Sequence, residues 1–192
     1  MTTPTDRAIA NAALRLLESE GADAVTMRRV AKAVGVTAMA IYRHYPSRAA
    51  LLDAIAEEGF AALATSLRKR RMAGSVVERL EKMGDLCLDH ALENPRLFEI
   101  MFLKPREGAR RYPSDFKARR SPTATQVADL VAEGMRDGTF GEDDAWEIAF
   151  EMGALSHGLI ALYLGGRVEL SRASFRALYR RSFRRYLNGL RS

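Results

Sequence analysis

The stretch TMRRVAKAVGVTAMAIYRHYPSR, residues 26–48, decides how the N-terminal part of the chain folds. Its spacing predicts two short helices joined by a sharp turn. Thr26 can cap the first helix, and Gly35 stands in the turn, where a left-handed backbone is easily reached. Ala31 is small at the point where the two helices would cross, and a bulkier side chain there would obstruct the crossing. The stretch therefore predicts a helix-turn-helix.

The second helix of this motif runs from Thr37 through Tyr45, and we expect its side chains on the side away from the core to point outward. We expect an inner side made of Val30, Val34, Val36, Ile41 and Tyr45. Small side chains at the start of the helix would let it approach the floor of a DNA major groove, with Ala38 and Met39 as candidates for contact with thymine methyl groups. The candidate DNA contacts, to bases and to phosphates, are Thr26, Arg28, Arg29, Thr37, Ala38, Met39, Tyr42, Arg43, His44 and Arg48.

Other interpretations of these residues stay open at this point. Tyr42 could be a core aromatic, and His44 is about as suited to packing against the next helix as to touching a phosphate. The two helices could also form a hairpin that serves only packing. An exposed methionine, tyrosine and arginine on one short helix are unusual for such a hairpin, which favours the DNA-binding interpretation.

Helical spacing of apolar residues continues through almost the whole chain, and no run shows the alternation of a half-buried strand. We predict an all-α protein of about nine helices: a three-helix head, 1–48, and a C-terminal ligand-binding and dimerisation domain, 49–192, connected by a helix at 47–70. The expected helices outside the motif are 6–20, 47–70, 76–93, 95–103, 122–136, 142–164 and 171–190, with a basic loop at 104–120.

Composition excludes several classes of protein. The 192 residues carry a net charge of +6 and a single cysteine, Cys87, so an internal disulfide framework and a zinc site built on several thiolates are excluded. No apolar run approaches the roughly 20 residues that cross a bilayer. We expect a cytoplasmic protein without a membrane span, a metal or another cofactor.

Charge is segregated along the chain, at +4 for residues 1–72, −5 for 73–164 and +7 for 165–192. If the last two long helices are antiparallel, acidic residues at the start of one would lie near basic residues at the end of the other. The expected groups are Glu142, Asp143, Asp144, Glu147 and Glu151 against Arg180, Arg181, Arg184 and Arg185. Such ion pairs would account for most of the charge segregation without any contact between these residues and DNA.

Three stretches, IANAALRLLESEG (9–21), TMRRVAKAVGV (26–36) and TAMAIYRHYPSRAALLDAI (37–55), resemble the TetR family of bacterial transcriptional regulators. NPRLFEIMFL (94–103) and GALSHGLIALYLGGR (153–167) are similar to the C-terminal domain of an AcrR-like subgroup with a His-Gly pair. The resemblance implies a repressor that binds a palindromic operator in double-stranded DNA as a homodimer through its last two helices. It also implies release by a small apolar or amphipathic molecule.

Candidates for lining such an effector pocket are the adaptable apolar and aromatic side chains of the C-terminal domain, although each is also suited to ordinary core packing. They are Met83, Cys87, Phe98, Met101, Phe102, Trp146, Phe150, His157 and Tyr163. Cys87 as a redox sensor would need exposure and a lowered pKa.

Catalysis and metal binding find little support in the sequence. Ser156 and His157 are adjacent, so on a helix they point about 100° apart, and no strand-borne nucleophile elbow is present. The three histidines are not spaced as a metal-binding pair on one helix face. We therefore expect no enzyme activity. The alternative functions are a basic helical protein that binds nucleic acid or anionic membrane without sequence specificity, and an all-α enzyme.

Overall fold

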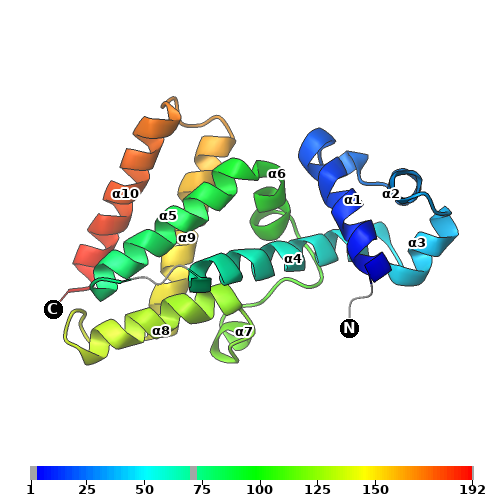
Figure 1. Ribbon diagram of the computed structural model, residues 1–192. Helices are drawn as coiled ribbons and strands as arrows, with labels where there is room; N and C mark the ends of the chain where they lie inside the picture. The colour runs from blue at the N-terminus through cyan, green and yellow to red at the C-terminus, as the bar shows by residue number, and fades with distance from the viewer. Residues whose placement is uncertain (1–3, 70–72, 192) are drawn as a thin grey trace. The chain divides into compact units, whose positions relative to one another are not determined.

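The computed structural model describes residues 4–69 and 73–191, and every regular element within them is helical (Figure 1). This confirms the all-α prediction. Within these described ranges the chain forms ten α-helices, one 3-10 turn and one π-helical turn. They are α1 (Pro4–Glu20), η1 (Ala22–Ala24), α2 (Met27–Val34), α3 (Ala38–His44), α4 (Arg48–Lys69), α5 (Val76–Glu93), α6 (Pro95–Phe98), η2 (Glu99–Leu103), α7 (Ser114–Lys117), α8 (Pro122–Arg136), α9 (Ala145–Leu164) and α10 (Arg172–Gly189).

The chain forms two compact units, and α4 runs from one into the other. The first unit contains the residues up to Ala61 together with Asn94–Ala109, and the second contains Ala62–Glu93 and the residues from Arg110 onward. The segment that carries α6 and η2 thus packs with the N-terminal helices, although more than thirty residues separate it from them in sequence. The predicted boundary at residue 48 concerns function and stays a prediction.

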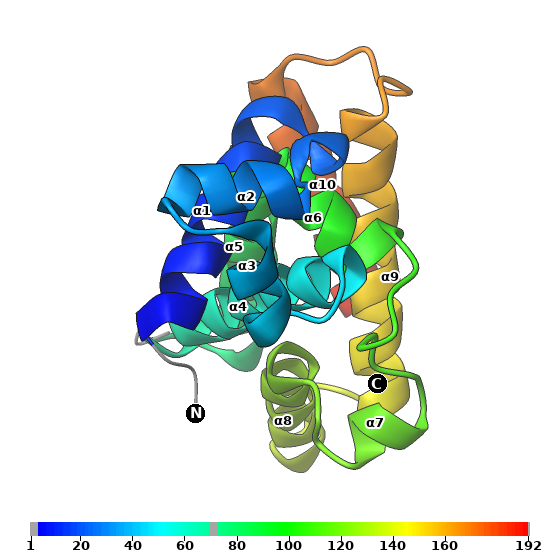
Figure 2. The same cartoon turned by 90° about the vertical axis from the view of Figure 1, so that its right-hand side faces the viewer.

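The core of the first unit is built where the helical spacing placed apolar side chains. Its fully buried members are Ile9, Ala13, Leu17, Val25, Val30, Ile41, Leu51 and Ile55. α1 packs on α2, and α2 on α3, so that α1 supports the helix-turn-helix from one side. Figure 2 looks onto this unit from the side on which α2 and α3 lie.

The second unit is a bundle in which α8, α9 and α10 pack with α5. A buried polar contact lies at the meeting of three of these helices. The hydroxyl of Tyr179 on α10 donates to the carbonyl oxygen of Gly84 on α5 at 3.1 Å, and the Oγ of Ser156 on α9 is 2.7 Å from the same hydroxyl. Gly84 leaves room for the Phe183 ring, which would lie 3.1 Å from an added Cβ. Small and hydrogen-bonded groups thus set the spacing of α5, α9 and α10.

The expected pairing of the α10 arginines with the start of α9 is wrong for Arg180 and Arg184. α10 packs against both α5 and α9, and arginines four residues apart face α5. Three ion pairs form a ladder: Arg176 with Asp89 at 2.5 Å, Arg180 with Asp85 at 2.8 Å and Arg184 with Glu81 at 2.7 Å. Between α9 and α10, the Tyr186 hydroxyl donates to Glu151 at 2.5 Å. The acidic partners are therefore supplied mainly by α5.

The segment expected to be one helix at 95–103 is divided into α6 and the π-helical turn η2. A π turn inserts one residue per turn and rotates the side chains that follow it. Met101 thereby lies against Gly59 of α4, and the ring of Phe102 meets Phe60 edge-on with centroids 5.1 Å apart. Within the predicted basic loop the chain forms the short helix α7.

No helix among residues 4–69 and 73–191 combines the length and apolarity needed to span a membrane.

Candidate nucleic-acid interface

The predicted helix-turn-helix is present, with the local contacts that its sequence indicates. Thr26 Oγ1 accepts from the backbone N–H of Arg29 at 3.3 Å and caps α2. Gly35 has φ of 77°, and the N–H of Val36 returns to the carbonyl of Ala31 at 3.0 Å, which closes the helix end. Thr37 Oγ1 then accepts from the N–H of Ala40 at 3.2 Å and starts α3.

α3 presents large apolar and aromatic side chains outward. Met39 is 67% exposed and Tyr42 47% exposed, while Ile41 is fully buried and Tyr45 nearly so. Tyr42 is therefore a surface residue, and its interpretation as a core aromatic is wrong. The inner position given to Val36 is also wrong, because it lies in the turn and is 38% exposed. An exposed methionine is unfavourable in water, so its position suits contact with another macromolecule.

Arg28 and Arg43 lie exposed on α2 and α3, and within the part of the chain that the structure describes neither forms an ion pair. Together with Thr37, Ala38, Met39 and Tyr42 they form the outer side of the motif. Cations on both helices beside the apolar side chains of α3 can bind phosphates while α3 contacts base edges. Their assignment as DNA contacts stays a prediction.

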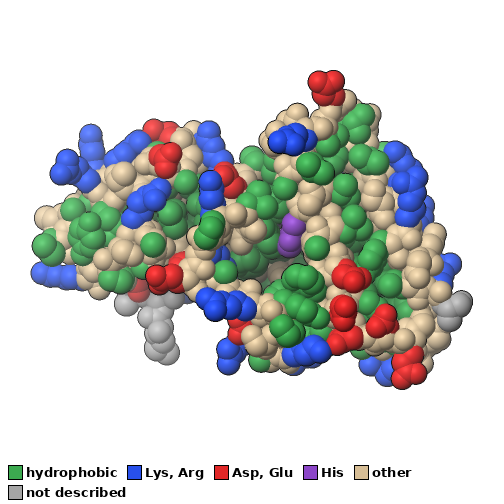
Figure 3. Space-filling view, turned by 180° about the vertical axis from the view of Figure 1, so that it is seen from behind, with side chains coloured by type: hydrophobic (Ala, Val, Ile, Leu, Met, Phe, Trp, Pro, Cys, Tyr) green, Lys and Arg blue, Asp and Glu red, His purple; other side chains and the backbone are tan. Residues whose placement is uncertain are grey.

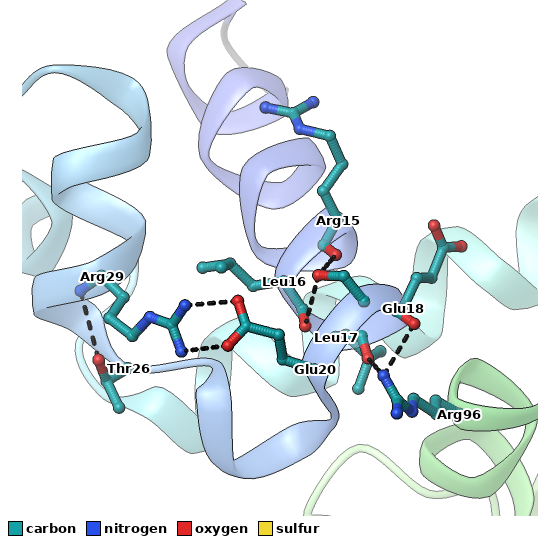
Figure 4. A network of polar contacts seen from close by, with 9 residues as sticks. Arg15, Leu16, Leu17, Glu18, Glu20, Thr26, Arg29 and Arg96 are labelled. Carbon is teal, nitrogen blue, oxygen red and sulfur yellow. Dashed lines mark hydrogen bonds and ion pairs between the residues drawn. The ribbon is translucent and has the colours of Figure 1, made fainter.

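Three other predicted DNA contacts have partners within the protein. Arg29 holds the carboxylate of Glu20 through both terminal nitrogens, at 2.9 and 2.5 Å (Figure 4). Arg48 donates to the carbonyl oxygens of Val25 and Ala22 at 2.7 and 2.6 Å. His44 Nδ1 lies 2.6 Å from a carboxylate oxygen of Asp6, a partner that differs from both interpretations the sequence left open. Each side chain therefore braces the motif in the absence of DNA.

The hydrogen bond from Arg29 lowers the pKa of Glu20, and the same contact raises the pKa of Arg29. Both groups are solvent-exposed, so water screens the pair and it contributes little to stability by itself. The cost of releasing Arg29 toward a phosphate is correspondingly small. The sequence does not indicate Glu20 as the partner of Arg29, because nine positions and a turn separate the two residues.

The predicted effector-pocket residues fall into the two units. Phe98, Met101 and Phe102 belong to the first, where the rings of Phe98 and Phe102 are 5.0 Å apart. The second holds Met83, Cys87, Trp146, Phe150, His157 and Tyr163.

Several of the second group already have packing partners. Phe150 stacks on Tyr112 at 4.4 Å, Tyr163 stacks on Phe175 at 4.0 Å, and the guanidinium of Arg119 lies 5.7 Å from the Trp146 ring. Their role in binding an effector stays a prediction.

Burial determines the protonation of two of these candidates. It raises the pKa of the Cys87 thiol to about 12, so the thiol stays protonated and lacks the thiolate character of a redox sensor. It lowers the pKa of His157 to about 4, so the imidazole is neutral near pH 7. Among the described residues, no group of three histidine, cysteine or carboxylate side chains is placed to hold a metal ion.

Two family models match the chain. Residues 9–55 match the model described as bacterial regulatory proteins, tetR family, and residues 80–186 match the tetracyclin repressor-like C-terminal domain. The chain belongs to the TetR family. The N-terminal match covers α2, α3 and the turn between them, so the helix-turn-helix of this TetR-family chain is its DNA-binding motif.

Curated relatives agree with this assignment over part of their length. The nucleoid occlusion factor SlmA of Vibrio campbellii is 35% identical over 95 residues, which cover 48% of each protein. The class A tetracycline repressor protein from transposon 1721 in Escherichia coli is 29% identical over 147 residues, covering 76% of this chain and 60% of that protein. The chain spans about half the length of the first curated relatives it matches.

Solved structures share the fold over almost the whole chain. A protein of unknown function from Rhodococcus sp. RHA1 has a TM-score of 0.79 at 26% identity, covering 97% of this chain and 95% of that one. The fatty acid degradation regulator FadR of Bacillus halodurans has a TM-score of 0.74 at 18% identity, covering 96% and 99%. TetR of Acinetobacter baumannii in complex with minocycline has a TM-score of 0.71 at 20% identity, covering 100% and 99%.

Proposed function

We propose that this TetR-family chain is a ligand-responsive repressor that binds a palindromic operator as a homodimer and is released by a small apolar or amphipathic molecule. The observation that carries the DNA-binding part is α3, a capped recognition helix that exposes Met39 and Tyr42. Beside them lies Arg43, which forms no ion pair with any described residue. Binding without sequence specificity is less well supported, because Arg176, Arg180 and Arg184 of the most basic segment are held by α5.

Dimerisation through α9 and α10 is supported by the surface of α9. Its outer side carries Ala154, Gly158 and Leu162, and Leu162 is 47% exposed. The inner side of α9 is apolar as well. A helix that is apolar all round is normally covered on all sides. Figure 3 shows hydrophobic side chains at the surface of the second unit, with acidic side chains beside them and basic ones along the outer edge. A second copy of the chain would cover this surface.

The effector is proposed to bind in the C-terminal domain, surrounded by the six pocket candidates of the second unit: Met83, Cys87, Trp146, Phe150, His157 and Tyr163. Support comes from structural neighbours that are described with minocycline and with resorcinol. The AcrR-like assignment rests on the pair His157 and Gly158 and stays a prediction.

Operator binding is tested by fluorescence anisotropy with a duplex from the region upstream of the chain's own gene, against a shuffled duplex of equal composition. We expect preferential binding whose affinity falls with salt, at a slope of about −0.9 per phosphate contacted. Replacing Met39 with alanine should reduce the preference several-fold, because an apolar contact with a thymine methyl group is lost. Leu170→Ala, another exposed apolar residue, is the control. Equal affinity of the wild-type protein for both duplexes would refute the proposal.

Dimerisation is tested by sedimentation of a Gly158→Arg variant, which places a charge on the proposed interface without meeting any atom of its own chain within 4 Å of an added Cβ. We expect a monomer with intact helical content and much weaker operator binding, because a dimer binds both half-sites together. A dimer that persists in this variant would exclude this face as the interface.

A further inference from the structure

Arg96 of α6 reaches the C-terminal end of α1, about eighty positions earlier in the sequence (Figure 4). Its Nη1 donates to the carbonyl oxygen of Glu18 at 2.9 Å and lies 3.5 Å from the carbonyl oxygen of Leu17. Both residues and α6 belong to the first compact unit. The contact therefore lies within the unit that carries the recognition helix.

The end of α1 offers carbonyl groups that can accept from such a donor. Gly21 leaves the helix with φ of 94°, so the last carbonyl groups of α1 cannot all be satisfied by a following helical turn. The N–H of Gly21 returns to the carbonyl of Leu17 at 2.9 Å, and Arg96 supplies a donor to the next carbonyl, of Glu18. A cation at this end also interacts favourably with the helix dipole. Arg96 thus acts as a C-terminal cap contributed by another helix.

α1 in turn holds both helices of the DNA-reading motif. At its C-terminal end Glu20 holds Arg29 of α2. At its N-terminal end Asp6 binds His44 through its carboxylate, and its carbonyl oxygen accepts from the Tyr45 hydroxyl at 3.2 Å. The position of α3 on the protein is therefore set by the position and straightness of α1.

We propose that Arg96 is a positioning residue for operator binding, which caps α1 and through α1 fixes the recognition helix. The DNA-reading unit is then discontinuous in sequence and includes Asn94–Ala109. The proposal rests on the proposed function for its operator readout. It requires no contact between Arg96 and DNA.

This role has a measurable signature. Removing the side chain takes a charge-assisted hydrogen bond away from α1 and leaves a less ordered helix end, and we expect operator affinity to fall about tenfold. The number of phosphates neutralised does not change, so the salt slope stays at the wild-type value. Replacing a phosphate contact instead lowers the affinity and reduces the slope by about one unit.

The experiment compares Arg96→Ala and Arg96→Lys in the full-length chain with two reference variants. Arg167→Ala removes an equal charge from an exposed position in the second unit, and Arg28→Ala removes a predicted phosphate contact. Affinity is measured at four salt concentrations, well below the unfolding temperature, with the active fraction determined by stoichiometric titration. We expect Arg96→Lys, which keeps one donor, to lose about threefold, and Arg167→Ala to match the wild type.

Hydrogen exchange of the DNA-free variants provides a readout that does not depend on an operator. Arg96→Ala should speed exchange at the end of α1 and also in α2 and α3, while exchange in the second unit stays unchanged. Faster exchange confined to the end of α1, or a reduced salt slope, would overturn the positioning role. If the wild-type protein shows no operator preference, the proposed function is wrong, and hydrogen exchange alone then decides the role of Arg96.

Discussion

The buried hydroxyl of Tyr179 allows a stability prediction to be worked from the structure. Tyr179 is 1% exposed and Ser156 4% exposed. Because the tyrosine donates to the Gly84 carbonyl, the serine must donate to the tyrosine. In Tyr179→Phe the ring keeps its volume and leaves no large cavity, but Ser156 loses its acceptor. An unsatisfied buried hydroxyl costs about 1–3 kcal/mol, which is about 2–8 °C in the unfolding midpoint of a chain of this size.

The assay is urea unfolding at one fixed protein concentration, since dimerisation would shift the apparent stability. A double-mutant cycle with Ser156→Ala should show a coupling of about 1 kcal/mol, because removing both hydroxyls leaves no orphaned donor. Tyr163→Phe is the matched control: the Tyr163 ring stacks on Phe175, and its hydroxyl forms no hydrogen bond within the described residues. We expect it to change stability by less than about 0.5 kcal/mol.

The same variant tests the titration of the tyrosine. Burial raises the pKa of Tyr179 well above its usual value, so the folded protein keeps the neutral form while the unfolded chain ionises. The contribution of the neutral Tyr179 hydroxyl to the free energy of unfolding is present below pH 10 and is lost progressively as the pH rises above 10. Tyr179→Phe should remove this loss. A variant as stable as the wild-type protein, or effects of the two substitutions that simply add, would refute the role assigned to this contact.

Three further predictions concern other parts of the second unit. Because burial lowers the pKa of His157 to about 4, the free energy of unfolding should fall as the pH drops from 6.5 to 4, by about 3 kcal/mol at most. Urea unfolding of His157→Gln should show a smaller fall over the same pH window. Replacing Arg176, Arg180 and Arg184 together by glutamine should lower the urea midpoint only modestly, because water screens exposed ion pairs, and should leave the salt slope of operator binding unchanged. Arg181→Gln, whose arginine has no ion pair in the described part of the chain, should leave the midpoint unchanged. A changed salt slope would place the ladder at the DNA. Gly134→Ala would bring a Cβ within 2.4 Å of the buried Phe140 ring and should lower the unfolding midpoint, at a cost of about 1–3 kcal/mol. Gly153→Ala is the control, because the nearest atom would lie 3.8 Å from its Cβ, and it should leave the midpoint unchanged. Equal midpoints for the two variants would show that Phe140 moves aside freely.

Local features of the candidate site were readable from the sequence because they depend on residues only a few positions apart. Thr26, Gly35 and Thr37 act through hydrogen bonds to residues three to five positions away, and the structure confirms each of them. The burial of Ile41 and the exposure of Met39 follow equally from helical spacing. Val36 was misplaced because it lies in the turn, where helical spacing does not apply.

The sequence by itself determined that the chain is helical, where the helix-turn-helix lies and which residues cap its helices, since helical periodicity and capping are local. Only the tertiary structure decided which partners the charged residues take. Arg29 binds Glu20, Arg96 caps α1, and Arg180 binds Asp85, ninety-five positions away. Such contacts depend on how helices cross, and the crossing is set by packing between distant faces. The same packing joins α6 to the DNA-reading unit.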